Sequence, residues 1–408
     1  MISHTMYSLG AKRSCIRELF EYGLQQAKVV GRENVMDFSI GNPSVPTPQA
    51  VTDAFDELVR SEDTLAIHGY TPAPGDFEAR AAVARNLTRR AGVEIRPQDI
   101  FFTCGAAPAI ISSIRALTVE NTEIMVIAPY FPEYRPYIEM NGCKLVAVPA
   151  DKKAFQIQLD QLEALITPNT QALIVNSPNN PSGVVYTVET LQKLAEVLTR
   201  KSREFGHPIY IISDEPYREL VYDGVDAPYL PGIYPDTLIC YSYSKIFSLP
   251  GERIGYVFVP ASATDHEELF AAIAGASRTL GHVCAPSLQQ KVVARCVDVK
   301  PDLRTYDDNR MTLYNALTSY GYRCIKPDGA FYLFAEAPGG SAKAFSDRAK
   351  AYNLLVVPGD DFGCPDFFRL STCVSREMVR KSLPVFEKLI SSVQDKTEDI
   401  FEIQGSSD

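Results

Sequence analysis

The chain contains 408 residues, of which 46% are hydrophobic and 22% are charged, and its formal net charge is −10. This composition is typical of a globular protein with two or three domains. The negative charge argues against a nucleic-acid partner, because a phosphate backbone is bound by basic surfaces. No apolar run approaches the ~20 residues that a membrane-spanning helix needs.

The cysteines are predicted to be reduced thiols. The chain has nine of them, an odd number, and no pair has the two-residue spacing of a zinc or redox motif. Residues 1–10 contain no apolar signal-peptide run. Both features favour a reducing, cytoplasmic location. With only five histidines, no protein-bound metal is expected.

Short apolar runs alternate with amphipathic segments in the first 300 residues. Helical spacing predicts a first helix over residues 12–30, and a strand over 35–40 follows. Residues 41–48 contain three prolines and are expected to form a loop. Helices are then expected at 108–117 and 188–201, and strands at 100–103, 124–128, 145–149, 172–176, 209–213, 238–242 and 256–259. This order predicts a mostly parallel sheet with helices on both faces, which binds ligands at the carboxyl ends of its strands.

The pattern changes after about residue 300 and indicates a smaller α+β domain. A helix is expected at 302–319, strands at 331–336 and 366–372, and a closing helix at 376–393. We therefore expect four regions. They are an N-terminal arm with a small-domain segment at 1–45, a large domain at 46–300, a small domain at 301–393 and a flexible polar tail at 394–408.

Lys245 directly follows one of the expected strands, in the run Ser242-Tyr243-Ser244-Lys245, and Arg253 lies eight residues later. A solvated lysine and a surface arginine would show the same pattern. The segment nevertheless resembles, without gaps, the Ser-x-Ser-Lys and Gly-x-Arg-x-Gly motif of class I aminotransferases, which use pyridoxal 5′-phosphate (PLP). The resemblance implies that Lys245 carries PLP as a Schiff base, that Ser242 and Arg253 bind its phosphate, and that Ser244 also contacts the cofactor.

Asp214 and Tyr217 end another expected strand, in the run 211–217. A helix-capping aspartate would explain this string equally well. It also resembles the family's Asp-Glu-x-Tyr motif. By that resemblance, Asp214 pairs with the pyridine nitrogen and keeps it protonated, while Tyr217 binds the phenolic oxygen. Both would then be catalytic together with Lys245, whereas Glu215 is expected to be structural.

Two further loops carry candidate cofactor contacts. The run 175–183 resembles the family's Asn-Pro-Thr/Ser-Gly motif, which implies that Asn180 donates to the phenolic oxygen and contacts substrate; composition alone supports only a turn. Phe131 follows the strand at 124–128, where an aromatic residue often belongs to the core. In the family, an aromatic at this position stacks on the pyridine ring.

Gly105, Ala106 and Ala107 lie between a strand and the helix that Pro108 opens. Small residues at a helix N-terminus expose free backbone N–H groups to an anion, although many α/β units have such a turn. The family places its phosphate-binding loop here. The resemblance therefore makes these three residues backbone ligands of the phosphate.

Arg369 lies within an apolar strand, so it requires an anionic partner, either an internal carboxylate or a ligand. The resemblance implies that it binds the substrate α-carboxylate, with Gly41 nearby. Residues 328–332 match a further family string. Tyr70, in the run 68–75, would reach the phosphate of the neighbouring subunit, which implies a homodimer with active sites at the subunit interface.

The resemblance extends from about residue 37 to 386, with its motifs in family order. It implies the PLP-dependent transferase fold of type I, with PLP bound by the large domain. The implied activity is ping-pong transfer of an amino group from an L-amino acid to a 2-oxo acid. Aspartate and 2-oxoglutarate are the first expectation, and aromatic amino acids or alanine are alternatives. No side-chain-reading residue can be assigned; Arg278 and His68 are the only candidates.

Two other functions remain open on the sequence alone. A PLP-dependent β-elimination or C–S lyase can use the same fold and motifs. A non-catalytic regulatory protein could also keep the fold, although the intact Lys245, Asp214, Asn180 and Arg253 argue against it.

Overall fold

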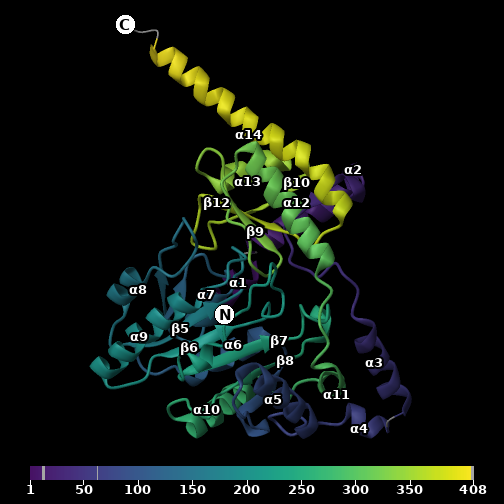
Figure 1. The fold of residues 1–408 in the computed structure, drawn as a ribbon, viewed down its shortest axis with the longest axis vertical. Coiled ribbons are helices and arrows are strands. Elements are labelled where there is room, and N and C mark those ends of the chain that lie inside the picture. The colour runs from purple at the N-terminus through teal and green to yellow at the C-terminus, as the bar shows by residue number, and fades with distance from the viewer. Residues whose placement is uncertain (12–13, 62, 406–408) are drawn as a thin grey trace.

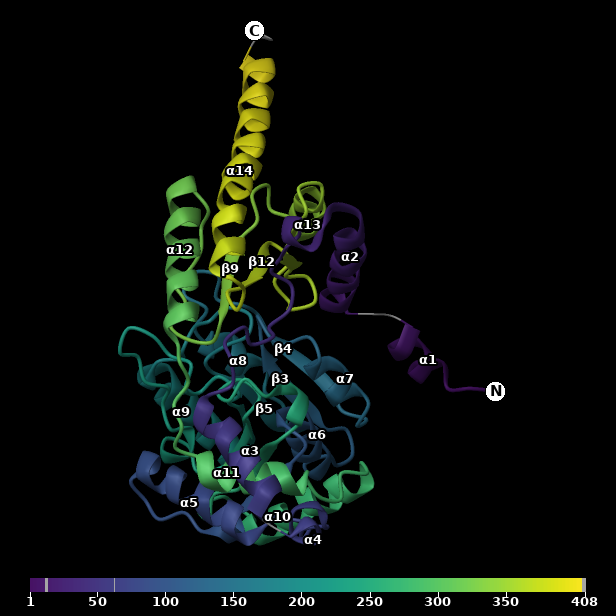
Figure 2. The same cartoon turned by 90° about the vertical axis from the view of Figure 1, so that its right-hand side faces the viewer.

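The computed structural model describes residues 1–11, 14–61 and 63–405, which form a larger and a smaller body (Figure 1). Helix α1 (His4–Ala11) has no buried residues and projects to one side in Figure 2, where its last residues line a cavity together with residues 130–137 of the larger body. The helix expected at 12–30 is observed as α2 (Cys15–Val30), and residues 12 and 13 lie outside the described ranges. Helix α2 packs on the smaller body (Figure 2).

A seven-stranded sheet forms the centre of the larger body, in the order β2-β8-β7-β6-β5-β3-β4. Its strands are β2 (Ile100–Thr103), β3 (Glu123–Ile127), β4 (Lys144–Val148), β5 (Thr170–Asn176), β6 (Tyr210–Asp214), β7 (Thr237–Ser242) and β8 (Gly255–Phe258). Strand β8 runs antiparallel to both neighbours, and the pairs from β7 to β4 are parallel. The expected strands and the mostly parallel sheet are confirmed.

Both faces of this sheet are covered, because alternate side chains of each strand enter different cores. On one face, Ile174 and Ile212 pack with α6 (Ala106–Ala116), α7 (Tyr134–Glu139) and α10 (His266–Thr279). On the other face, Leu173 and Ile211 pack with α8 (Leu159–Leu165) and α9 (Val188–Phe205). The same face continues over α3 (Gln49–Ser61), α5 (Phe77–Ala91) and α11 (Ser287–Cys296), with the short α4 (Thr64–His68) beside them.

The smaller body contains a three-stranded antiparallel sheet in the order β11-β12-β9. Its elements are α12 (Arg304–Tyr320), β9 (Tyr332–Glu336), α13 (Ala342–Lys350), β11 (Val357–Pro358), β12 (Phe367–Ser371) and α14 (Arg376–Gly405). The N-terminal segment joins this body through β1 (Met36–Asp37), which pairs with β10 (Leu354–Leu355). Phe38 lies in the same core as Phe368 and Phe386.

Three expected boundaries are wrong, one of them the end of the helix expected at 188–201, which continues as α9 to Phe205. Strand β1 is shorter than the expected 35–40, because Asp37 Oδ1 accepts hydrogen bonds from the Ser39 amide and hydroxyl and turns the chain away. Helix α14 does not end at residue 393 but continues to Gly405, so residues 394–405 are helical. The sequence has no glycine or proline between 394 and 404 to stop it. Its last turns project from the body (Figure 1).

Three further properties of the described residues bear on the expectations above. None of their helices is long and apolar enough to cross a membrane. Within the same ranges, no three His, Cys, Asp or Glu side chains come together as a metal site would require. All nine cysteines are free thiols.

Phe386 joins the N-terminal segment to the core of the smaller body. Its side chain is 0% exposed and lies 6.4 Å from the ring of Phe38. We expect Phe386→Ala to lower the free energy of unfolding by about 3–5 kcal/mol, because the cavity left behind cannot be filled. Urea denaturation, followed through the unfolding transition of the smaller body, measures this decrease in the free energy of unfolding. Phe77→Ala, at a half-exposed position, is the control, and an equal effect there would contradict the assignment.

Candidate active site

A cavity of about 300 Å³ opens at the carboxyl ends of the central strands. Twelve of the predicted residues line it: Gly41, Ala106, Ala107, Phe131, Asn180, Asp214, Tyr217, Ser242, Ser244, Lys245, Arg253 and Arg369. Gly105, another predicted residue, caps the helix that carries Ala106 and Ala107. The structure therefore brings together residues that are as many as 328 positions apart in the sequence (369 − 41).

The register of the sheet explains much of this convergence. Asn176 pairs with Asp214 across β5 and β6, and Ser242 pairs with Gly255 across β7 and β8. Asn176, which was not predicted, donates through Nδ2 to the Asp214 carbonyl at 2.8 Å. Its Oδ1 accepts from the Asn180 amide at 2.7 Å. Asn176 thus ties the loop that carries Asn180 to the end of β6.

Asp214 is buried with only one of its carboxylate oxygens satisfied by the protein. Tyr134 Oη donates to Oδ2 at 2.5 Å, whereas Oδ1 has no hydrogen-bond partner among the described residues. Burial raises the pKa of Asp214 to about 7, although the Tyr134 hydrogen bond opposes this. A buried carboxylate with a free oxygen is suited to a cationic partner such as a protonated ring nitrogen.

Lys245 points its amine into the same cavity. Nζ donates to the Gly41 carbonyl at 2.7 Å and lies 5.5 Å from the ring centroid of Phe331. Burial, together with the nearby charges of Arg253 and Arg369, lowers the pKa of Lys245 to about 8, although Cys373 opposes this. An amine with this pKa is partly neutral near physiological pH, so it can act as a nucleophile or a base.

Arg253 and the start of α6 form an anion-binding end of the cavity. Gly105 caps α6 with φ = 98°, and a Cβ there would lie 3.0 Å from Arg253 Nη2. The absence of that Cβ lets the guanidinium approach the free amides of the helix N-terminus. Ser242 Oγ and Ser244 Oγ are 2.7 Å apart beside them. A cation, two hydroxyls and a helix N-terminus together suit a phosphate.

Arg369 is 1% exposed, and the structure does not show the internal salt bridge that was one alternative. Nη1 donates to Asn180 Oδ1 at 2.9 Å, and Nη2 donates to the Ser39 carbonyl at 2.6 Å. Nε has no hydrogen-bond partner, and no carboxylate forms an ion pair with this guanidinium, in the described ranges. A buried cation with only neutral partners is suited to an anionic ligand.

The sequence matches the aminotransferase class I and II family over residues 33–385. The chain belongs to this family.

Related proteins support the same conclusion. The aromatic-amino-acid aminotransferase 2 of Thermococcus litoralis is 30% identical, over 92% of this chain and 95% of the relative. The aspartate aminotransferase of Bacillus subtilis is 29% identical, over 90% and 93%. An amino transferase structure from Eubacterium rectale is 51% identical, covers 96% of this chain and 99% of its own, and has a TM-score of 0.94. Aspartate aminotransferase from Thermus thermophilus with maleate is 27% identical, covers 93% and 97%, and has a TM-score of 0.81.

Members of this family depend on PLP, so the protein is a PLP-dependent transaminase of fold type I. The residues present fit the cofactor. The free Oδ1 of Asp214 suits the ring nitrogen, the Lys245 amine suits the aldehyde, and the end of the cavity at Gly105 and Arg253 suits the phosphate.

Several lining residues of the aminotransferase were not predicted. Besides Asn176, they include Ile16 from α2, Tyr137 from α7 and Tyr332 from β9. Tyr134 is not in the lining, but its hydroxyl donates to Asp214 Oδ2. Tyr134 begins α7 three residues after Phe131, and this closeness in the sequence was the available signal. Tyr332 ends the family string at 328–332, but no sequence pattern showed which of that string's aromatics faces the cavity.

Three candidates do not line this cavity. Tyr70 is 96% exposed and follows α4, and His68 ends that helix. Arg278 lies in α10. Both helices are at the end of the larger body remote from the smaller one (Figure 1). Within one chain, therefore, the structure does not bring Tyr70, His68 or Arg278 to the cavity.

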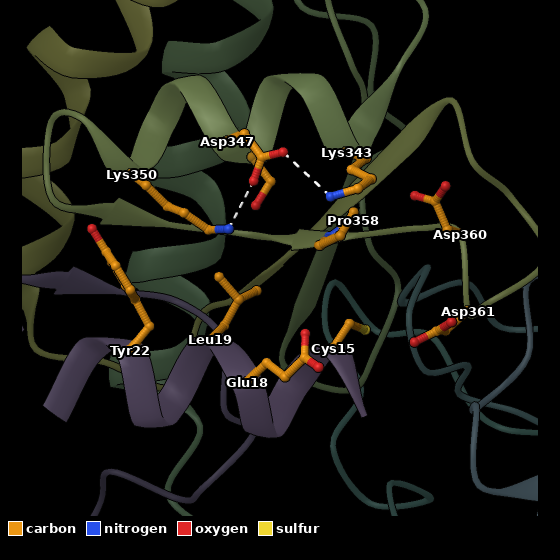
Figure 3. Close-up of a pocket in the computed structure, with 11 residues that line it drawn as sticks. Cys15, Glu18, Leu19, Tyr22, Lys343, Asp347, Lys350, Pro358, Asp360 and Asp361 are labelled. Atoms are coloured by element: carbon orange, nitrogen blue, oxygen red, sulfur yellow. Dashed lines mark hydrogen bonds and ion pairs between the residues drawn. The ribbon is translucent and has the colours of Figure 1, made fainter. Parts of the chain in front are cut away.

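A second cavity, of about 450 Å³, lies between α2 and α13 (Figure 3). Asp347 stands between Lys343 and Lys350 and forms ion pairs with both, at 3.4 and 2.8 Å. The positive charges of both lysines are therefore already paired with Asp347. Glu18, which lines the cavity from α2, is exposed to solvent. None of the predicted residues lines this larger cavity, whereas twelve of them line the smaller one.

The pKa of Lys245 predicts how the apoenzyme captures PLP. Below about pH 8 the amine is protonated and cannot attack the aldehyde, so the rate constant should rise about tenfold per pH unit and then level above that pH. Stopped-flow absorbance after mixing apoenzyme with PLP measures it. Lys245→Ala should give no adduct that survives borohydride reduction and denaturation. A rate independent of pH between 6 and 9 would contradict the lowered pKa.

Proposed function

We propose that the enzyme transfers the amino group of an L-amino acid to a 2-oxo acid through two half-reactions at this one cavity. The observation that carries the proposal is Arg369, a buried cation with a free Nε beside the Lys245 amine. An α-carboxylate held there would place the substrate Cα near that amine. Aspartate and 2-oxoglutarate are the first pair proposed, because several relatives are named aspartate aminotransferases.

In this proposal, different residues contact the ring nitrogen, the ring oxygen, the ring face and the phosphate of the cofactor. Bound PLP supplies a protonated pyridine ring that withdraws electrons from the substrate Cα. Asp214 Oδ1 keeps the ring nitrogen protonated, and Tyr217 and Asn180 donate to the ring oxygen. Phe131 covers one face of the ring. Ser242, Ser244, Arg253 and the amides of Gly105, Ala106 and Ala107 hold the phosphate.

Two residues of the chain act on the substrate in this proposal. Arg369 binds the α-carboxylate, with Gly41 beside it, and so fixes the direction of the Cα–H bond. Lys245, whose amine opens into the same cavity, would move a proton between the substrate Cα and the cofactor carbon C4′. Its lowered pKa near 8 suits both taking up and releasing that proton.

The half-reaction tests this proposal. Adding single amino acids to the purified holoenzyme without any 2-oxo acid should convert the cofactor band above ~400 nm to one near ~330 nm. Aspartate, phenylalanine, tyrosine and alanine form the panel, and the fastest conversion names the donor. Lys245→Ala should retain its oligomeric state and lose turnover by about a thousandfold, because it removes the amine proposed to move the Cα proton.

Two outcomes would contradict the proposal. Multiple-turnover transamination by Lys245→Ala would remove that lysine from the mechanism. Release of pyruvate and ammonia from a cysteine conjugate, without an added 2-oxo acid and faster than any transamination, would assign the protein to the lyases.

We also propose that the enzyme is a homodimer in which Tyr70 binds the phosphate of the neighbouring subunit. Tyr70 is a nearly fully exposed aromatic side chain, and Leu65 and Val59 on the adjoining helices are exposed too. Exposed apolar side chains grouped along one edge are typical of a subunit interface. A single chain therefore leaves Tyr70 available to a second copy.

Mixing two inactive or impaired variants tests the role of Tyr70 in the dimer. A heterodimer of Lys245→Ala and Tyr70→Ala subunits has one cavity with both defects and one cavity with neither. After subunit exchange, the mixture should therefore show more activity at limiting PLP than the mean of the two parents. If Tyr70 served its own subunit, both cavities would be defective and mixing would give no gain.

The division of the chain is likewise a proposal. We propose that residues 46–300 form a large PLP-binding domain, and that 301–393 with the segment 1–45 form the small one. The separate core that contains Met36, Phe38 and the helices α12 to α14 supports this division. We propose a cytoplasmic location, which the nine free thiols support.

A further inference from the structure

Tyr332 is a buried tyrosine at the start of β9 that contacts three groups of the site. It is 3% exposed and lines the cavity. Its ring lies 4.6 Å from Arg369 Cζ, and its hydroxyl lies 3.1 Å from the Tyr217 hydroxyl. The same hydroxyl packs so closely against Gly41 that a Cβ there would overlap it. Tyr332 therefore occupies the space between the substrate end and the cofactor end of the cavity.

The ring of Tyr332 controls the plane of the Arg369 guanidinium. Arg369 Cζ lies over two aromatic rings, at 4.6 Å from the centroid of Tyr332 and 5.2 Å from that of Phe362. The two terminal nitrogens are held by Asn180 and Ser39. A planar cation that contacts two rings and is held at both terminal nitrogens has little freedom to rotate, so its Nε edge keeps one direction for a carboxylate.

The hydroxyl of Tyr332 controls the proton of Tyr217. Burial raises the pKa of Tyr332 to about 12 and that of Tyr217 well above its ordinary value, so both carry a proton at neutral pH. Only one of the two can donate across their 3.1 Å contact. When Tyr217 donates to the ring oxygen of the cofactor, its own oxygen is left to accept from Tyr332. The two hydroxyls then form a chain in which each bond strengthens the next.

We propose that Tyr332 is a positioning residue with two separable parts. Its ring orients Arg369 toward the substrate carboxylate, and its hydroxyl strengthens the hydrogen bond that Tyr217 donates to the cofactor's ring oxygen. This inference rests on the function proposed above and deepens it.

Tyr332→Phe removes the hydroxyl and keeps the ring. A weaker hydrogen bond from Tyr217 stabilises negative charge on the ring oxygen less, so the bound cofactor should lose its imine proton at higher pH. We expect the midpoint of the cofactor's absorbance change to rise by about 0.3–1 pH unit. The dissociation constant of hydrocinnamate, a carboxylate that cannot react, should stay within about twofold of the wild type.

Tyr332→Leu removes both parts. It should show the same rise in the absorbance midpoint and should also weaken hydrocinnamate binding about tenfold, because Arg369 loses one stacking ring. The KM for the amino donor should rise in parallel. If the leucine variant does not fold, the absorbance midpoint of Tyr332→Phe alone still tests the role of the hydroxyl.

Tyr322→Phe is the matched control. The Tyr322 hydroxyl is also buried and donates to the Phe386 carbonyl at 2.8 Å, but it lies in the core of the smaller body. Its loss should leave both the absorbance midpoint and the hydrocinnamate affinity unchanged.

The possible failures are distinguishable. A wild-type protein that shows no cofactor band refutes the proposed function itself. A wild-type enzyme that transaminates, with Tyr332→Phe unchanged in its absorbance midpoint, refutes the role of the hydroxyl. Equal loss of hydrocinnamate affinity in the phenylalanine and leucine variants refutes the role of the ring.

Discussion

The site depends on charged groups that the fold buries without pairing them. Asp214 keeps a free carboxylate oxygen, and Arg369 keeps a free Nε, among the described residues. Isolated buried charges cost several kcal/mol, so folded chains normally pair them internally. In this enzyme the pairing is left to the cofactor and the substrate, whose binding then stabilises the folded protein. Much of the surrounding structure keeps these two groups in place and accessible to a ligand.

Backbone and neutral side-chain groups do much of that holding. Arg369 is fixed by Asn180 and the Ser39 carbonyl, and the Lys245 amine by the Gly41 carbonyl. Neutral acceptors orient a cation without neutralising it, so its charge stays available to a ligand. These contacts also join the two bodies, because Ser39 and Arg369 belong to the smaller body and Asn180 and Lys245 to the larger one.

Arg218, compared with Arg369, shows the difference between a structural and a functional charge. Arg218 is equally buried, but it forms ion pairs with Glu215 and Glu219 at 3.3 and 2.8 Å, and its guanidinium lies over the Tyr241 ring. The positive charge of Arg218 is therefore paired within the protein. Glu215, expected to be structural, belongs to this closed network, one residue from Asp214.

The sequence by itself determined the strand order along the chain, and the lysine, aspartate and arginine that follow or occupy particular strands. These features are local, since apolar runs and motifs act over a few residues. It did not determine the end of α14, where no glycine or proline lies between residues 394 and 404, nor the roles of Asn176, Tyr134 and Tyr332. Those depend on contacts between distant segments: the pairing of β5 with β6, and the approach of β9 to the loop that carries Tyr217. Only the tertiary structure decides such contacts, because they arise from sheet register and packing.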